Sequence, residues 1–332
     1  MQQLLRKIAF PFSLIYALVV HLRNALYDVG VFTSVSYGTP TICVGNLSVG
    51  GTGKTPMTEY LIRMLQDHRV AVLSRGYKRQ SKGFVLATPH TGVLELGDEP
   101  YQLKEKFPNV AVAVDADRRN GIAQLEEFVR PEVIILDDAF QHRRVKPSFS
   151  ILLTMYNMLY VDDWYLPTGN LRDSKKEARR ADVIIVTKCP AHLSHTDRER
   201  VVKRLRANPD QQILFATLEY HNEVTDGGQR KMGLLELRGK QVALVTGIAS
   251  PEPLVNHLDS LGIQFEHFEF GDHHHFTDKE VEQFKSHEVV LTTEKDFVRL
   301  EGRLKNLFYV RITHSFDADD KDTLEKMIRK LV

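Results

Sequence analysis

The chain has 332 residues, a formal net charge of +1 and two cysteines. This length exceeds the usual size of a single hydrophobic core, so we expect two domains. The nearly balanced charge gives no electrostatic case for a nucleic-acid partner, which needs a clustered basic face. Cys43 and Cys189 lie far apart without metal-ligand spacing, and we interpret them as buried thiols of a reducing compartment, outside any disulfide framework.

The N-terminal thirty residues differ in character from the rest of the chain. Arg6 and Lys7 precede an uncharged, mostly apolar stretch from Ile8 to Val20, which is followed by Arg23. The stretch has roughly two-thirds of the length that a membrane-spanning helix needs, so we do not expect it to span. We expect either an interfacial helix with these basic residues at headgroup level, or a helix packed on its own domain. A secretory signal peptide is disfavoured because no small-residue cleavage site follows, and Pro11 confines regular helix to the residues after it.

A glycine-rich loop between an apolar run and a helix-patterned segment predicts a phosphate-binding site. From Cys43 to Pro56 the sequence reads C-V-G-N-L-S-V-G-G-T-G-K-T-P. Glycines let backbone N–H groups approach phosphates, and the N-terminus of the following helix adds partial positive charge. Ser48 stands where the G-x-x-x-x-G-K-[ST] pattern has glycine, but a plain glycine-rich hairpin would leave the lysine and its hydroxyl neighbour unexplained. The residues expected to bind the nucleotide are Ser48, Val49, Gly50, Gly51, Thr52, Gly53, Lys54 and Thr55.

Short apolar runs alternate with helix-patterned segments along the chain that follows. They predict a doubly wound α/β domain, in which helices cover both faces of a parallel sheet. Polar residues come directly after these runs, and in such sheets ligands gather at the carboxyl ends of the strands. The predicted strands are 70–73, 110–114, 133–136, 150–153 and 183–186.

The pattern changes near Leu218. Asp226-Gly227-Gly228 separates two strand-like pieces, which predicts a hairpin connector. A second, smaller α/β series follows, and it ends in an amphipathic helix from Asp317 to Val332. Its strands are expected at 241–245, 265–270, 289–292 and 307–312. The predicted organisation is a membrane-interfacial segment (1–30), a P-loop nucleotide-binding domain (31–217), a two-stranded linker (218–240) and a smaller α/β domain (241–332).

Two adjacent aspartates predict a Mg²⁺ site. Asp137 and Asp138 end an apolar V-I-I-L run, where the Walker B carboxylate of a P-loop protein stands. Mg²⁺ prefers hard oxygen ligands, so we expect it to bind Thr55, one of these aspartates and phosphate oxygens. Adjacent side chains at the end of a strand point in different directions, so the other aspartate meets a neighbour. The alternative is an ordinary polar strand terminus.

Two further polar stretches suit the activation of a phosphoryl acceptor. Gln141 and His142 belong to the run from Phe140 to Arg144, which could neutralise developing charge or be a solvated loop. Asp98 and Glu99 lie in a Gly-Asp-Glu-Pro turn before a helix. A carboxylate there could accept the proton of an alcohol, although a helix N-cap is the alternative.

The C-terminal third contains a histidine cluster and a second acidic turn. Consecutive side chains in Asp272-His273-His274-His275 diverge, which disfavours a shared metal ion. A histidine that orients or relays a proton for a carboxylate in a cleft between the domains is favoured instead. Thr293 and Asp296 have the spacing of a helix cap, and a cap is favoured over a contact with a purine base or the hinge.

Taken together, these motifs resemble one family, the tetraacyldisaccharide 4'-kinases of lipid A synthesis in Gram-negative bacteria. They occur in the family's order and span nearly the whole chain; no single motif is diagnostic, but the ordered set is. The matching motifs are V-G-N-L-S-V-G-G-T-G-K-T-P, Ser74-Arg75-Gly76-Tyr77, Gly97-Asp98-Glu99-Pro100, Asp117-Arg118 with Gly121, Asp137-Asp138 through Arg143, Leu166-Pro167-x-Gly169, Leu171-Arg172, Asp272-His273-His274 and Thr293-Glu294-Lys295-Asp296.

The resemblance implies transfer of the γ-phosphate of ATP to the 4'-hydroxyl of a tetraacylated glucosamine disaccharide 1-phosphate, giving lipid IVA at the cytoplasmic face of the inner membrane. It also implies a P-loop NTPase-like domain and a smaller α/β domain joined by a two-stranded β-ribbon, and we expect a peripheral monomer. Asp98 is implied as the catalytic base, paired with His273, and Lys54 as a catalytic residue that holds ATP. Thr55, Asp137 and Asp138 are implied at Mg²⁺, and Arg75, Glu99, Arg118, Gln141 and His142 at the substrate.

Three positions depart from the family's usual pattern. Ala139 stands where the family generally has glycine, Val161-Asp162-Asp163 replaces a Gly-Asn-Gly turn, and Asp173 replaces a glutamate. The geometry of that loop and any role of Asp173 therefore stay open. Trp164 lies in an aromatic-rich run that could face acyl chains, the membrane or the core.

Two other functions are compatible with the glycine-rich loop. One is a P-loop kinase that acts on another membrane-associated sugar. The other is a nucleotide-driven switch or chaperone ATPase. Such switch proteins usually carry a lysine where Val49 stands and work as symmetric dimers.

Overall fold

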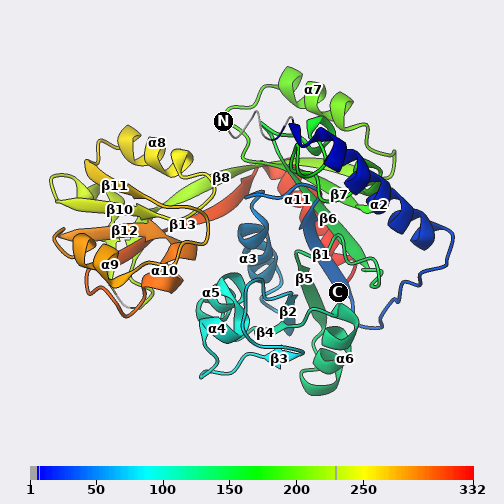
Figure 1. Ribbon diagram of the computed structural model, residues 1–332, viewed down its shortest axis with the longest axis horizontal. Helices are drawn as coiled ribbons and strands as arrows, with labels where there is room; N and C mark the ends of the chain where they lie inside the picture. The colour runs from blue at the N-terminus through cyan, green and yellow to red at the C-terminus, as the bar shows by residue number, and fades with distance from the viewer. Residues whose placement is uncertain (1–5, 7, 229) are drawn as a thin grey trace.

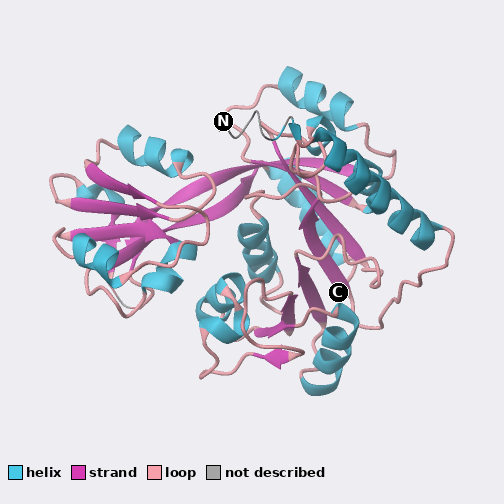
Figure 2. Ribbon diagram, in the orientation of Figure 1, coloured by secondary structure: helices cyan, strands magenta, loops and turns pink. Residues whose placement is uncertain are grey.

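The computed structural model describes every residue except 1–5, 7 and 229. The chain forms two lobes, and a long pair of strands joins them (Figures 1 and 2). Lys7 and residues 1–5, which belong to the predicted interfacial segment, lie outside the described residues.

A parallel sheet forms the centre of the first lobe. Its strands are β1 (Thr41–Asn46), β2 (Val70–Ser74), β3 (Val85–Leu86), β4 (Ala111–Val114), β5 (Val133–Asp137), β6 (Phe149–Met155), β7 (Val183–Thr187) and the start of β8 (Gln212–Thr225). They lie in the order β3-β4-β2-β5-β1-β6-β7-β8, and only β3 is antiparallel to its neighbour. The strands read as continuous apolar runs because both faces of the sheet are buried. The five predicted strands are confirmed, and the predicted phosphate loop follows a strand near the middle of the sheet.

Helices cover both faces of this sheet. They are α3 (Lys54–Met64), α4 (Val93–Leu96), α5 (Asp98–Lys106), α6 (Arg118–Phe128), α7 (His195–Leu205) and α11 (Ala318–Arg329), with 3-10 helices η1 (Tyr160–Asp162) and η2 (Lys175–Arg180). Successive strand residues point to opposite faces. Cys43 of β1 therefore packs in the core under α6 and α7, whereas Ile42 and Val44 pack in the core under α3, α5 and α11.

The second lobe has a smaller parallel sheet. It contains β10 (Val242–Thr246), β11 (Phe265–Glu269) and β12 (Val289–Thr293), and β12 pairs in parallel with β13 (Leu307–Phe316). Helix α8 (Glu252–Ser260) and the 3-10 helix η3 (Leu234–Leu237) cover one face, and α9 (Asp278–Phe284) and α10 (Glu294–Leu300) cover the other. The predicted second α/β series is confirmed.

The ribbon between the lobes consists of β8 and β13, paired antiparallel (Figure 1). The first part of β8 pairs with β7, and its far end forms a hairpin with β9 (Lys231–Gly233) in the second lobe. The register of the ribbon shifts between Val310 and Ile312. The predicted linker 218–240 therefore differs from the structure. Its hairpin is present but lies within the second lobe, and the ribbon's second strand comes from the C-terminal part of the chain.

After β13 the chain returns to the first lobe. Leu324 and Ile328 of α11 are fully buried in the first lobe's core, together with Met57 and Leu61 of α3. The predicted amphipathic helix is present, but it does not belong to the second lobe, as the boundary 241–332 implied. Helical spacing identifies an apolar face, but it does not identify the sheet on which that face packs.

Helix α2 (Phe10–Asp28) packs on the first lobe through polar side chains. The Ser13 hydroxyl donates to Thr168 Oγ1 at 2.8 Å, and Asn24 Nδ2 donates to Asp173 Oδ1 at 2.7 Å. Pro11 stands in the first turn, where its missing N–H has no intrahelical partner. Asp173, whose role the sequence left open, is fully buried here and anchors α2.

The outer face of α2 is apolar. Its exposed side chains include Phe12, Leu14, Ile15, Leu18, Val19 and Leu22. None of the described helices is both long enough and apolar enough to cross a membrane. Arg23 was expected at headgroup level, but its Nη2 donates to the backbone oxygen of Gln141 at 2.6 Å, so this guanidinium turns toward the protein.

Candidate active site

The predicted phosphate loop joins the end of β1 to the start of α3. Gly50 and Gly53 have φ angles of +115° and +87°, which side-chain-bearing residues rarely adopt. Lys54 and Thr55 stand in the first turn of α3, where the helix N-terminus carries partial positive charge. The loop therefore has the geometry that its glycines and its lysine predicted.

Neighbouring strands hold this loop in place. Asn46 Nδ2 donates to Thr52 Oγ1 at 2.8 Å, and Thr187 Oγ1 donates to the backbone oxygen of Thr52 at 2.9 Å. Two N–H groups of the loop already have partners: that of Val49 donates to the oxygen of Asn170, and that of Thr52 donates to the oxygen of Gly50. Ser48 is buried and forms an isolated bridge with Leu171. Incoming phosphates must therefore compete with the backbone for part of the loop.

A carboxylate held by two cations lies beside the loop. Lys54 Nζ is 3.8 Å from Asp138 Oδ1, and Arg172 binds the same carboxylate through Nη1, 3.0 Å from Oδ2, and through Nη2. Burial raises the pKa of Asp138, but Lys54 and Arg172 outweigh burial and hold this pKa below its usual value. Arg172 also donates to Asn46 Oδ1, so its guanidinium joins the Asp138 carboxylate to the end of β1, just before the loop.

Asp137 is buried at the end of β5. Its carboxylate accepts hydrogen bonds from Thr58 Oγ1 at 3.3 Å and from Ser74 Oγ at 3.1 Å. Burial, and then the charges of Glu99 and Asp138, raise the pKa of Asp137 to about 7. A nearby cation reverses such a shift because it favours the ionised form.

Asp98 and His273, predicted as a pair, meet across the boundary between the lobes. His273 Nδ1 lies 3.0 Å from Asp98 Oδ2, and Arg299 Nε donates to the same oxygen at 3.2 Å. Burial raises the pKa of Asp98, but the hydrogen bonds from His273 and Arg299 hold it far below its usual value. Asp98 is therefore ionised at neutral pH. The charge of Glu99, the next residue, acts on Asp137 at the end of β5.

Two cations and a carboxylate surround the His273 ring. Lys295 Nζ lies 3.0 Å from His273 Nε2, and an ammonium group can only donate. His273 Nδ1 lies 3.0 Å from Asp98 Oδ2, which accepts, and 3.0 Å from Arg299 Nη2, which donates. Lys295 thus orients the ring of His273.

Two glycines let the loops around Asp98 approach each other. A Cβ at Gly97, where φ is +87°, would lie 2.8 Å from the carbonyl oxygen of Tyr77. A Cβ at Gly76 would lie 2.9 Å from the carbonyl oxygen of Leu96. Only glycine fits at both positions. The Tyr77 ring contacts the His273 ring at a centroid distance of 5.4 Å, so the loop after β2 borders the pair.

The residues predicted at the substrate lie in different environments. Arg75 is exposed in the loop after β2, and Glu99 is half-buried in the first turn of α5. Gln141 Nε2 donates to the backbone oxygen of Asn46 at 2.6 Å, so Gln141 supports the strand before the phosphate loop. Burial lowers the pKa of His142 to about 4, which keeps this ring neutral.

Arg118 is buried beneath the site. Its Nη1 donates to the backbone oxygen of Asp115 at 2.6 Å, and its Nη2 donates to the backbone oxygen of Asp137 at 3.3 Å. The side chain therefore ties the ends of β4 and β5 together. A direct contact of Arg118 with substrate stays a prediction and requires the guanidinium to leave these oxygens.

The other sequence expectations have clear structural outcomes. No group of three or more His, Cys, Asp or Glu side chains in the described part of the chain could hold a metal ion. His274 turns away from His273, stacks on Phe270 and binds Glu280 at 3.1 Å. Thr293 Oγ1 accepts from the N–H of Asp296 at 3.2 Å, which confirms the predicted helix cap.

The loop with the unusual Val-Asp-Asp turn is built on Asp163. Asp163 Oδ1 accepts from the N–H groups of Trp164 at 2.8 Å and Asn170 at 3.0 Å. The carboxylate therefore organises the turn. The Trp164 ring is exposed and packs edge-on against Phe10 of α2 at a centroid distance of 5.7 Å, which rules out a core role.

The sequence did not point to Arg299 or His314. Arg299 lies one helical turn after Lys295 on α10, and this spacing places the two cations on one face of the helix. This spacing was the sequence signal that could have indicated a role for Arg299. His314 Nε2 lies 2.9 Å from the backbone oxygen of Gly53, to which it donates. No local pattern could reveal this contact, because the two residues are 261 positions apart.

His314 makes the stability of the chain depend on pH. Burial lowers the pKa of this histidine to about 4 from its ordinary value of 6.5. As pH falls below 6.5, His314 binds a proton in the unfolded chain but stays neutral in the folded chain. We therefore expect a loss of roughly 3 kcal/mol of stability between pH 6.5 and 4 from this group.

Urea unfolding of wild type and His314→Gln at pH 7.5 and 5 tests this expectation. The glutamine amide can still donate to Gly53 but does not titrate, so the variant should lose less stability at pH 5. His195→Gln, at an exposed histidine, is the matched control. An equal loss in wild type and His314→Gln would contradict the expectation.

Three comparisons with known proteins agree with this geometry. Residues 5–332 match the family model described as tetraacyldisaccharide-1-P 4'-kinase. The chain is 48% identical over 320 residues to the tetraacyldisaccharide 4'-kinase of Flavobacterium johnsoniae, covering 94% of this chain and 93% of that protein. It is 47% identical to the tetraacyldisaccharide 4'-kinase of Bacteroides thetaiotaomicron, with coverages of 89% and 83%. Its fold is similar to the crystal structure of LpxK from Aquifex aeolicus in complex with ATP, with a TM-score of 0.80, 33% identity and coverages of 98% and 99%.

Proposed function

Because the chain belongs to the tetraacyldisaccharide-1-P 4'-kinase family, we propose that it transfers the γ-phosphate of ATP to the 4'-hydroxyl of a tetraacyldisaccharide 1-phosphate, with Asp98 as the base. The observation that carries the residue assignment is the contact of Asp98 with His273 across the boundary between the lobes. Both residues come from one chain, so this pairing needs no partner subunit. The family membership favours this acceptor over another sugar and over a switch ATPase.

The chemistry follows from the positions of the side chains. Asp98 accepts the proton of the 4'-hydroxyl while the hydroxyl oxygen attacks the γ-phosphorus of ATP. The bond between the γ-phosphorus and the bridging β-phosphate oxygen breaks, and ADP leaves. His273 donates to Asp98 and orients it, and Lys295 holds the histidine. Lys54, at the start of α3, neutralises charge on the phosphates.

The oxygen donors near the loop fit Mg²⁺. Thr55 supplies a hydroxyl, and Asp137 and Asp138 supply carboxylates, which are hard ligands of the kind this ion prefers. Two carboxylates do not form a closed metal cage, and phosphate oxygens and water complete the coordination of Mg²⁺ in such sites. When bound, the ion would neutralise charge on the transferring phosphoryl group. The raised pKa of Asp137 agrees with this fit, because a cation there restores the ionised form.

Helix α2 supplies a surface for the lipid side of the reaction. A surface helix ordinarily turns its apolar face to the core, but α2 binds the lobe through Ser13 and Asn24 and exposes its apolar residues. An apolar face of this kind inserts shallowly into a bilayer. Because the acceptor is a lipid and ATP is cytosolic, this orientation supports a location at the cytoplasmic face of the inner membrane.

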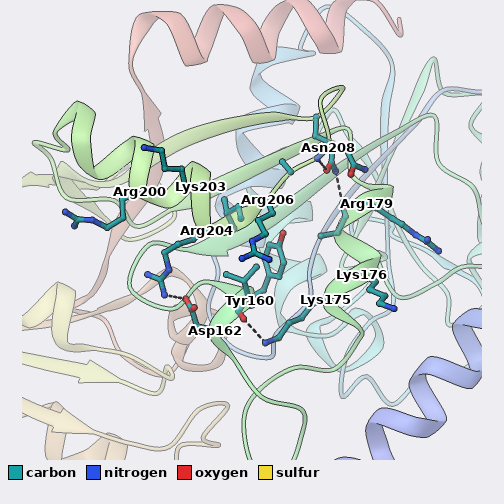
Figure 3. Close-up of a pocket in the computed structure, with 15 residues that line it drawn as sticks. Tyr160, Asp162, Lys175, Lys176, Arg179, Arg200, Lys203, Arg204, Arg206 and Asn208 are labelled. Carbon is teal, nitrogen blue, oxygen red and sulfur yellow. Dashed lines mark hydrogen bonds and ion pairs between the residues drawn. The ribbon is translucent and has the colours of Figure 1, made fainter.

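A basic groove adjoins α2. Its volume is about 890 Å³, and its lining residues come from η1, η2, α7 and the segment after α7 (Figure 3). Seven of its fifteen lining residues are Lys or Arg and one is acidic, so the groove is strongly positive in a chain of nearly zero net charge. Arg179 of the groove binds Asp28 at the end of α2. Anionic lipid headgroups suit this charge, beside the apolar residues of the helix.

An assay with the disaccharide in anionic vesicles tests both parts of the proposal. Labelled phosphate should pass from ATP to the disaccharide, and little ATP should be hydrolysed without acceptor. Ile15→Ser/Leu18→Ser should weaken vesicle binding more than 10-fold, since a buried aliphatic side chain contributes about 1.5–3 kcal/mol. The same variant should keep its rate on detergent-dispersed acceptor. Unchanged vesicle binding would contradict the membrane assignment, and hydrolysis independent of acceptor would support the switch ATPase.

A further inference from the structure

Helices α5 and α10 lie side by side across the lobe boundary and are joined at both ends (Figure 1). Asp98, the first residue of α5, binds Arg299 in the last turn of α10. Lys106, the last residue of α5, binds Glu294, the first residue of α10. The two helices therefore run antiparallel, and we call these two ionic contacts the first and the second clamp. The first clamp contains Asp98, the catalytic base. The second clamp has no part in the chemistry described above.

The second clamp is a buried cluster of three charges. Lys106 Nζ lies 2.6 Å from Glu59 Oε2 and also contacts Glu294 Oε1. The side chains of Glu59, Lys106 and Glu294 are 1%, 12% and 7% exposed. They come from three elements: α3, which follows the phosphate loop, α5, which carries Asp98, and α10, which carries Arg299. One ammonium group thus joins the nucleotide helix, the base helix and the second lobe.

Charged and titratable groups on every side face this cluster. Arg63 Nη2 and Gln102 Nε2, each 3.0 Å away, donate to Glu59 from α3 and α5. On the ribbon, the backbone of Ile312, next to the register shift of β13, lowers the pKa of Glu294. Tyr309 and Arg311 of β13 and His221 of β8 complete the surroundings. The cluster therefore lies where the ribbon changes register between the lobes.

The charges explain why the lysine is necessary. Glu59 and Glu294 repel each other when both are ionised, and burial strengthens this repulsion because the surroundings screen it weakly. Lys106 contacts both carboxylates and converts the repulsion into attraction. Without this ammonium group, the second lobe is pushed away from α3 and α5 at the ribbon.

We propose that Lys106 is a positioning residue that sets the angle between the lobes at which Asp98 meets His273. The proposal rests on the catalytic role of Asp98 given above. It assigns to Lys106 no contact with ATP or acceptor. It predicts that loss of the lysine lowers kcat, changes ATP affinity little, and has its largest effect where both glutamates are ionised.

Lys106→Met tests the proposal through the pH dependence of turnover. At pH 8.5 we expect kcat to fall at least 10-fold, with the KM for ATP within 2-fold of wild type. Burial, then Glu59, raises the pKa of Glu294 to about 7, and loss of Lys106 raises it further, so the defect should grow as pH rises toward 8.5. Glu294 is then protonated at pH 6 and can donate to Glu59, so the defect should be smaller at that pH. Lys104→Met, on the same helix, is the matched control, because the hydrogen bonds of Lys104 in the described part of the chain go to Pro89, Thr91 and Glu105 of the first lobe.

A variant that also lacks the negative charge of Glu294 distinguishes a loss of positioning from a loss of folding. Lys106→Met/Glu294→Gln carries no repelling pair, so its kcat at pH 8.5 should recover at least 5-fold over that of Lys106→Met. If Lys106→Met does not fold, Lys106→Gln, whose amide can still donate to one glutamate but carries no charge, should show a fall in kcat at pH 8.5. Wild-type kcat in Lys106→Met at both pH values, or no recovery in the double variant, would overturn the proposal.

A distance measurement keeps this test independent of the role of Asp98. Spin labels at Leu94→Cys and Glu282→Cys report the separation of the lobes, because both positions are exposed and both native cysteines are buried. Lys106→Met should broaden the distance distribution at pH 8.5, and Glu294→Gln in the same chain should narrow it again. If Asp98→Asn kept its turnover, the catalytic assignment would fail while this distance change still stood. An unchanged distribution in Lys106→Met would refute the positioning role.

Discussion

The Asp98→Asn variant should fold, bind ATP with normal affinity and lose about 10²–10⁴-fold in kcat. Asparagine has the size of aspartate, and its Oδ1 can still accept from Arg299, so the contact between the lobes is kept. The amide cannot take up the proton of the acceptor hydroxyl. Turnover of the disaccharide and ATP binding by calorimetry measure the two effects separately.

The acidic neighbour on the same helix supplies the control for this variant. Glu105→Gln removes one negative charge from an exposed position of α5 and should leave kcat within 2-fold of wild type. If Asp98→Asn turned over at a near-normal rate, another group would have to be the base. The cluster of Asp98, His273 and Arg299 would then be a structural contact between the lobes.

The Lys54→Met variant is expected to lose about 10²–10³-fold in kcat/KM, as for removal of one group that stabilises charge in a transition state. Methionine keeps most of the length of the side chain but has no charge to place on the phosphates. The fold should survive, because Asp138 remains bound to Arg172. Steady-state kinetics and ATP binding measure the loss.

Lys146→Met serves as the comparison for this change, since Lys146 is exposed at the opposite end of the sheet from the phosphate loop. It should behave as wild type in both measurements. Normal ATP affinity together with normal turnover in Lys54→Met would show that the loop does not bind the transferred phosphate.

Sequence reasoning succeeded where a local signal specifies a local structure. The continuous apolar runs at 133–136 and 183–186 are buried strands, because only a sheet covered on both faces has such runs. Gly50, Gly53 and Lys54 form the loop they predicted, because positive φ angles and a helix start are properties of a few neighbouring residues. The pairing of Asp98 with His273 came from family resemblance, and their contact is confirmed.

Sequence reasoning was wrong where the answer depended on which elements pack together. The apolar face of α11 was evident from spacing, but only the return of β13 to the first lobe decided that Leu324 packs against α3. Arg23 reads as a headgroup cation on an apolar segment, yet the rotation of α2 on the lobe turns it to the backbone of Gln141. A helical pattern gives the composition of a face and no information about its partner.

The sequence alone thus determined the local units of this protein: the strands, the phosphate loop, the helix caps and the acidic and basic residues available to a site. The tertiary structure alone decided the joins between these units, such as Arg299 on Asp98, His314 on Gly53 and Lys106 on Glu294. Backbone conformation depends on neighbours a few residues apart, and so it leaves a pattern in the sequence. Contacts between residues 188 or 261 positions apart depend on how the whole chain folds back, and they leave no pattern in the sequence.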